Sequence, residues 1–143
     1  MIKTRKQFIA TLLALGTLTA GASMAWDGKR SGAEARLKAR LTGPAIAALK
    51  PSGEAEFRSS VGRSRLSVEV EDVNLPAGTP LTVWSQRGKD APAMIGTITL
   101  GPPPLRTGEL ELNTQDGQTV PALQAGDVIT IRNDTSAILS GTL

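Results

Sequence analysis

The chain has 143 residues, with 16 basic and 13 acidic side chains and a net charge of +3. It contains no cysteine, no histidine and no tyrosine. These absences exclude serine–histidine–aspartate and cysteine–histidine catalysis and the usual zinc, copper and haem sites, because each of these needs an imidazole or a thiolate. Stability must come from packing and hydrogen bonds, since no disulfide can form.

The first 25 residues have the pattern of a signal peptide. Basic residues precede an apolar run over about residues 8–18, and a small-residue cleavage site ends at Ala25, with Ala22 as the alternative. That run is shorter than the roughly 20 residues needed to span a bilayer, and no cysteine is present to carry a lipid. We expect a signal peptide (1–25), a flexible segment (26–35) and a β-sandwich domain (36–143), secreted or periplasmic in a bacterium, with no stable membrane anchor after cleavage.

Charge is unevenly distributed along the exported chain. Without residues 1–25, 13 basic and 13 acidic residues remain, so the high isoelectric point owes much to the leader and nucleic-acid binding is not expected. Residues 26–65 carry a net charge of +5 and residues 66–143 carry −5. This asymmetry predicts pairing of the basic N-terminal part with an acidic strand face, within one molecule or by self-association.

Short alternating segments separated by Gly, Pro, Asn and Asp predict strands throughout the exported chain. About eight short strands without a long helix predict an all-β fold, a single antiparallel sandwich of seven or eight strands. Asp116-Gly117 favours a tight turn with positive φ. The expected strands cover 35–43, 53–60, 64–73, 81–86, 93–100, 106–113, 126–133 and 136–143.

The first of these segments admits two interpretations. Arg36, Lys38 and Arg40 alternate with apolar residues, as on a half-buried strand. A helix over 31–42 is the alternative, because Ser31 and Glu34 have the spacing of a capping box. We favour the strand, on which the three basic side chains form a ladder available for partner contact.

The order of the segments from about Leu41 to Leu143 resembles a known pattern. The stretches "RLSVEVEDVNLPAGTPLTV" and "VPALQAGDVITIRN", followed by a return through residues 140–143, resemble a group of uncharacterised exported bacterial proteins and, more loosely, the CHRD domain, a β-sandwich named for chordin. The resemblance implies a sandwich and an exported location, and no catalytic residue. CHRD domains commonly carry histidines in their central strands. This chain has none, so no metal role is carried over.

Two strands carry glutamates at alternate positions, Glu69 with Glu71 and Glu109 with Glu111. Alternate strand residues lie roughly 6.5–7 Å apart, a spacing open to paired catalytic acids. Their neighbours are aliphatic, without the aromatic or amide groups that hold a sugar. We therefore interpret them as the solvated face of strands, with the basic ladder lying opposite one pair.

Asp72 breaks the alternation of its strand. It would point inward unless a β-bulge lay near residues 71–72, and its expected role is to bind backbone amides of the following turn. Calcium is the only metal that the composition leaves open, and no loop has a dense D-x-D-x-D spacing. Its oxygen ligands would come from Asp72, Asn74, Asn113, Asp116, Asp127, Asn133 and Asp134.

Trp84 is predicted to face outward with Thr82, while Leu81 and Val83 face the core. Such a ring packs under a loop or against an edge, or contacts a ligand or partner.

These observations predict an exported non-enzymatic interaction or envelope module, without a cofactor, whose partner is an envelope or extracellular protein or a glycan. The alternatives are a carboxylate-based extracellular hydrolase and a carbohydrate- or calcium-binding accessory domain. The weak candidates for ligand or partner contact are Asp72, Trp84, Arg36, Lys38 and Arg40.

Overall fold

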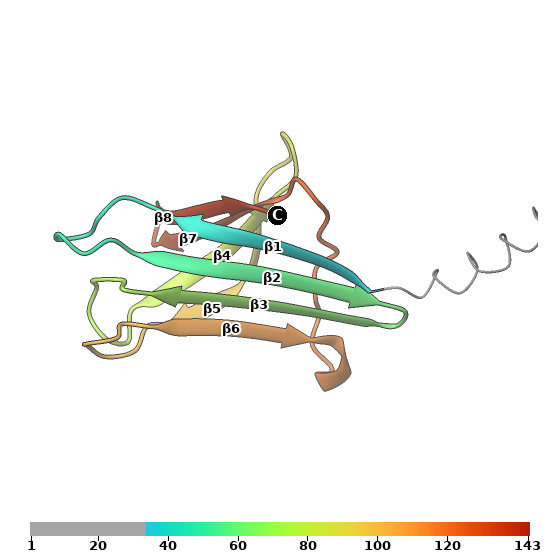
Figure 1. Cartoon of the computed structure of the whole chain (residues 1–143), viewed down its shortest axis with the longest axis horizontal. Helices are drawn as coiled ribbons and strands as arrows, with labels where there is room; N and C mark the ends of the chain where they lie inside the picture. Colours follow the sequence, from blue (N-terminus) through green and yellow to red (C-terminus); the bar gives the residue numbers. More distant parts are fainter. Residues whose placement is uncertain (1–33) are drawn as a thin grey trace, which may run out of the picture. The chain divides into compact units, whose positions relative to one another are not determined.

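Eight antiparallel strands in one nearly closed sheet, of order β5-β4-β7-β8-β1-β2-β3-β6, make up the fold (Figure 1). The structure is a computed structural model and describes residues 34–143. The predicted all-β class is confirmed. The predicted signal peptide and most of the 26–35 segment lie outside the described residues.

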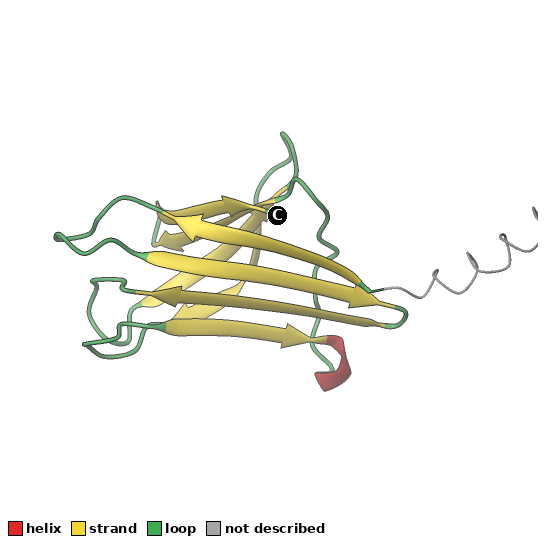
Figure 2. Ribbon diagram, viewed as in Figure 1, coloured by secondary structure: helices red, strands yellow, loops and turns green. Residues whose placement is uncertain are grey.

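The strands match the alternating segments of the sequence to within about two residues, and no α-helix occurs in residues 34–143 (Figure 2). Residues 35–42 form a strand, so the strand interpretation of that segment is correct. Gly117 has a φ of 80°, as predicted, and ends a short 3₁₀ helix, η1 (Thr114–Asp116). The strands are β1 Ala35–Thr42, β2 Ser52–Ser60, β3 Arg63–Glu71, β4 Pro80–Gln86, β5 Ala93–Thr99, β6 Gly108–Asn113, β7 Val128–Asn133 and β8 Ser136–Thr142.

The core is built from the apolar half of each alternation. On β3, Leu66, Val68 and Val70 are buried, while the residues between them are exposed or half-buried. Leu81 and Val83 on β4 are fully buried, which confirms the predicted orientation of that strand. Each such side chain contributes about 1.5–3 kcal/mol relative to exposure to water.

The strands form two continuous ladders of four. One is β6-β3-β2-β1 and the other is β8-β7-β4-β5. Figure 1 shows the first set side by side in front of β4, β5 and β7. The ladders join at one residue pair, Thr42 with Ser140. Close backbone approach at this junction requires glycine: a Cβ on Gly43 would collide with the Ile138 carbonyl, and one on Gly141 with the Arg40 carbonyl.

The free edges of the sheet, β5 and β6, come together through side chains and loops. Gly96 of β5 lies against the Leu110 side chain of β6. Beyond the strand ends, the Gly101 amide donates to the Thr107 carbonyl at 2.8 Å. This closure covers the core and leaves the outer face of β1, β2, β3 and β6 open to solvent.

Candidate functional site

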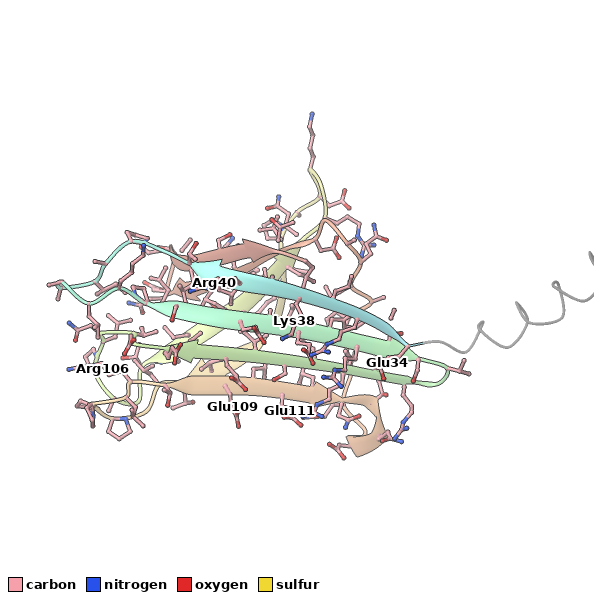
Figure 3. The ribbon with its side chains drawn as sticks, viewed as in Figure 1. Glu34, Lys38, Arg40, Arg106, Glu109 and Glu111 are labelled. Atoms are coloured by element: carbon pink, nitrogen blue, oxygen red, sulfur yellow. The ribbon has the colours of Figure 1, made fainter. Side chains whose placement is uncertain are left out.

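The outer face of β1, β2, β3 and β6, here called the charged face, carries most of the charged side chains of the strands. Cross-strand register aligns them into three rows perpendicular to the strands. The basic row is Arg36, Arg58, Arg65 and Asn113; the middle row is Lys38, Glu56, Ser67 and Glu111; the acidic row is Arg40, Glu54, Glu69 and Glu109. In Figure 3, Lys38 and Arg40 stand on β1, and Glu109 and Glu111 stand on β6, with β2 and β3 between the two strands.

The basic ladder of β1 does face a pair of glutamates, but not either of the two pairs singled out in the sequence. Because β1 pairs with β2, its partners are Glu54 and Glu56. Lys38 Nζ lies 2.9 Å from Glu54 Oε1 and 3.4 Å from Glu56 Oε2. The stretch "GEAEF" (53–57) has glutamates at alternate positions, just as the other two pairs do. Only the order of the strands in the sheet shows which of the three pairs meets the basic ladder.

Glu56 is the centre of an ion-pair network. Arg36 Nη2 donates to its carboxylate at 2.6 Å, and Arg58 and Lys38 also contact it. Hydrogen bonds from Arg36 first, and then from Arg58 and Lys38, lower the pKa of Glu56 to about 2 against the opposing effect of desolvation. The same pairing raises the pKa of the Arg36 guanidinium. The charges around Glu56 on the charged face are therefore neutralised by pairing within the chain.

The acidic row is not neutralised in the same way. Glu69 lies directly opposite Glu109 on one side and Glu54 on the other. Within residues 34–143, no cation lies within ion-pair distance of Glu69, Glu71 or Glu109. Like charges directly opposite in a sheet are destabilising. The row lines an open groove of about 690 Å³, bounded by Arg40 at its β1 side.

The acidic row is an open, negatively charged surface. The glutamates of the acidic row are exposed on a regular sheet, and the charged face carries no aromatic side chain. In the part of the chain that the structure describes, no three His, Cys, Asp or Glu residues are grouped so as to hold a metal ion. The oxygens considered for calcium are dispersed: Asn74 Nδ2 donates to the Ile46 carbonyl, Asn113 Oδ1 accepts from the Gln115 amide, and Asp127 binds an arginine.

Asp72 adopts a backbone conformation different from the expected one. The ladders of β3 are regular up to Glu71, so the predicted bulge is wrong. The alternation of buried and exposed residues instead shifts by one position at Asp72, which is exposed and has a left-handed backbone conformation with a φ of 58°. Its amide donates to the Leu105 carbonyl at 3.3 Å, which ties the end of β3 to the loop before β6. Asp tolerates this conformation better than most residues do.

Trp84 lies half-buried on the outer face of β4, which belongs to the β8-β7-β4-β5 ladder and not to the strands of the charged face. Its Nε1 donates to Thr82 Oγ1 at 2.8 Å, and the guanidinium of Arg132 on β7 lies 4.4 Å from the ring centroid. The structure thus keeps the five candidate residues on three separate surfaces: the basic ladder, the end of β3, and the β4–β7 face.

Sequence reasoning missed the ion pair between Arg87 and Asp127. Asp127 is only 2% exposed, and both of its oxygens accept hydrogen bonds from Arg87, at 2.9 and 2.8 Å. Oδ2 also accepts from the Gln124 amide at 2.9 Å. The hydrogen bond from Arg87 is the main cause that lowers the pKa of Asp127. The sequence signal for this buried carboxylate was its position in the Leu-x-Ala-Gly-Asp turn (residues 123–127), immediately before a buried strand.

Comparisons with models of protein families, with curated proteins and with solved structures found no match to this chain. Among residues 34–143, no helix is long and apolar enough to cross a membrane.

Proposed function

We propose that this chain is an exported, non-enzymatic interaction module of the bacterial envelope, and that the charged face is its binding surface. The observation that carries this proposal is that Glu69, Glu71 and Glu109 have no cation of residues 34–143 within ion-pair distance, beside a basic row on one open sheet face. Glu69 and Glu109 repel each other in the isolated chain, and cations of a partner would offset that repulsion. Export rests on the signal-peptide pattern of residues 1–25.

We also propose that the fold is a sandwich rather than a barrel. Its support is that the two four-stranded ladders share one residue pair, Thr42 with Ser140, and that no ladder of residues 34–143 joins β5 to β6. A CHRD-like sandwich is proposed on the order of the segments and on the Leu-x-Ala-Gly-Asp turn.

A carboxylate-based hydrolase has less support. A general acid needs an environment that raises its pKa, usually an apolar pocket. The acidic row instead lies open to water on a regular sheet. Binding by long-range charge attraction requires no such pocket.

The proposal is tested by capture from a bacterial envelope extract onto the immobilised exported chain. The variant Glu69→Gln/Glu71→Gln/Glu109→Gln removes three charges from the groove. Its matched control, Asp90→Asn/Asp116→Asn/Asp134→Asn, removes three exposed charges that lie outside the strands, in η1 and in two loops. We expect the immobilised wild type and the control to retain envelope components in a salt-sensitive way. We expect the groove variant to lose this retention.

Equal retention by both triple variants would overturn the charged face as the binding surface. A hydrolase screen of the same proteins tests the absence of catalysis. Hydrolysis by the wild type that the groove variant lacks would replace the interaction module with the hydrolase.

A further inference from the structure

The outward side chains of β3 form a charge pattern in which each charge would meet its opposite if a second copy of the strand ran antiparallel to the first. In order along the strand they are Arg63, Arg65, Ser67, Glu69 and Glu71. Two positive charges precede the central serine and two negative charges follow it. Two copies of β3 running in opposite directions, face to face about Ser67, would place every charge opposite its counterpart.

The neighbouring strand β2 continues this pattern in full, and β6 continues only its acidic half. On β2, Arg58 lies beside Arg65, and Glu54 lies beside Glu69. On β6, Asn113 lies beside Arg65, and Glu109 lies beside Glu69. Rotation about an axis across the strands over the middle row therefore exchanges the basic row with the acidic row, which brings Arg58 to Glu54 on β2 and the neutral Asn113 to Glu109 on β6. Glu56 and Glu111 lie on the axis and face their own copies, but each already has an arginine of its own chain within ion-pair distance.

We propose that the partner of the charged face is a second copy of this chain, bound through a twofold axis that passes over Ser67. Arg65 then faces Glu69 of the second copy, and Arg63 faces Glu71 of the second copy, each twice by symmetry. This inference rests on the proposed function, because it uses the same face as a binding surface.

The shape of the face fits this arrangement. Ser67 is the short side chain among long ones, and a hollow of about 190 Å³ around it is lined by Glu54, Glu56, Arg58, Arg65 and Glu69. Long side chains of a second copy, or bridging waters, have room to enter there. Sheets that pack face to face cross at about 30°, which keeps the residues nearest the axis opposite one another.

The cations needed for this contact have donors available. Arg65 uses Nη2 for Glu111 at 2.9 Å, and a guanidinium has five N–H donors. The carboxylates they would meet, Glu69 and Glu71, have no cation of residues 34–143 within ion-pair distance. The basic ladder of β1 would face the same basic ladder of the second copy, and these like charges repel. The contact is therefore centred on β3, with β1 at its rim.

The test uses charge reversal in the purified exported chain, with sedimentation velocity as the readout. We expect a dimer at low ionic strength that dissociates as salt is added, because the pairs are exposed to screening. Arg65→Glu and Glu69→Arg each place like charges opposite one another twice per dimer. Each should weaken association on the order of 100-fold or more.

An equimolar mixture of the two variants should associate again. The first variant carries carboxylates at both positions and the second carries cations at both, so the contacts between positions 65 and 69 in a mixed dimer are complementary. Glu111→Gln is the matched control, because it removes the Arg65 ion pair within the chain but leaves β3 unchanged. Lys89→Glu, on an exposed loop, controls for net charge. Thermal unfolding confirms that each variant is folded.

A wild type that stays monomeric at low ionic strength would overturn the inference, as would variants that fail to associate when mixed. This result is distinguishable from failure of the proposed function. If the groove variant loses envelope binding while the wild type is monomeric, the charged face binds a different partner and only the dimer is rejected. If all proteins are monomeric and the immobilised groove variant still retains envelope components as the wild type does, both proposals fail.

Discussion

Glu69 of β3 lies directly opposite Glu109 of β6, and no cation of residues 34–143 lies within ion-pair distance of either carboxylate. Like charges directly opposite one another in a sheet are destabilising. This unpaired repulsion on an open face is the physical basis for the proposal that the face binds a partner.

Glu109→Gln should therefore raise the free energy of unfolding, by about 0.2–0.5 kcal/mol at low ionic strength. Glu111→Gln, two residues along the same strand, should lower it slightly because it loses the ion pair with Arg65. Urea unfolding of the two variants in parallel measures the difference. If Glu109→Gln were the more destabilising of the two, the repulsion would not exist.

Glu56 should make stability depend on pH in the acid range. Its pKa falls from an ordinary value of 4.5 to about 2 in the folded chain. A lowered folded pKa gives stability that is present above the unfolded pKa and is lost as pH falls through the folded one, here between about pH 4.5 and pH 2. The loss should be about 1–2 kcal/mol, allowing for solvent screening of a surface network.

The control for this pH effect is Glu56→Gln, which should be less stable than the wild type at pH 7 and show a flatter acid dependence. Urea unfolding across pH 2–7 gives both curves. Parallel curves for the two proteins would show that other carboxylates carry the acid sensitivity.

The strands were predictable because their signal is local. Alternation of apolar and polar residues, as in Leu66, Val68 and Val70, identifies a strand and its buried face without knowledge of any other strand. Glycine and proline mark where the strands end. The outward direction of Thr82 and Trp84 follows from the same alternation.

The charged face was predictable only in part, because it depends on which strands are neighbours. Nothing local in residues 35–42 says that Lys38 meets Glu54 rather than Glu69, since strand order is set by the packing of the whole domain. The phase change after Glu71 was visible in the pattern. Its mechanism was not, because a bulge and a left-handed Asp72 give the same shift.

The ion pair of Asp127 and Arg87 should contribute more to stability than any pair on the charged face. Asp127→Ala leaves the Gln124 amide without its acceptor and Arg87 without its anion, and we expect a loss of about 2–4 kcal/mol. Asp90→Asn, an exposed carboxylate in the loop after β4, should change stability by less than about 0.5 kcal/mol. Thermal unfolding of both variants would contradict this ranking if their midpoints coincided.

The junction of the two ladders should not accept a side chain. A Cβ on Gly43 would overlap the Ile138 carbonyl, and backbone cannot yield as a flexible side chain can. Gly43→Ala should cost about 2 kcal/mol or more. Gly101→Ala is the control, because the nearest atom to its Cβ, the Thr107 carbonyl oxygen, lies 3.1 Å away and only a small shift is needed. Equal denaturation midpoints would show that β1 and β8 separate readily.

Trp84 should report on the outer face of β4 and β7. In a Trp26→Phe background it is the only tryptophan, because the chain has two. Arg132→Gln removes the cation 4.4 Å from its ring, so acrylamide quenching should increase and stability should fall by about 0.5–1 kcal/mol.

The same single-tryptophan protein separates the interaction module from a carbohydrate- or calcium-binding domain. Titration with soluble polysaccharides or Ca²⁺ should leave the emission of Trp84 unchanged if the charged face is the binding surface, because that face is formed by β1, β2, β3 and β6, whereas Trp84 lies on β4. A saturable change that Arg132→Gln abolishes would move the binding site to the β4–β7 face. Saturation that is indifferent to Arg132 but lost in the groove variant would instead indicate a ligand of the charged face sensed across the core.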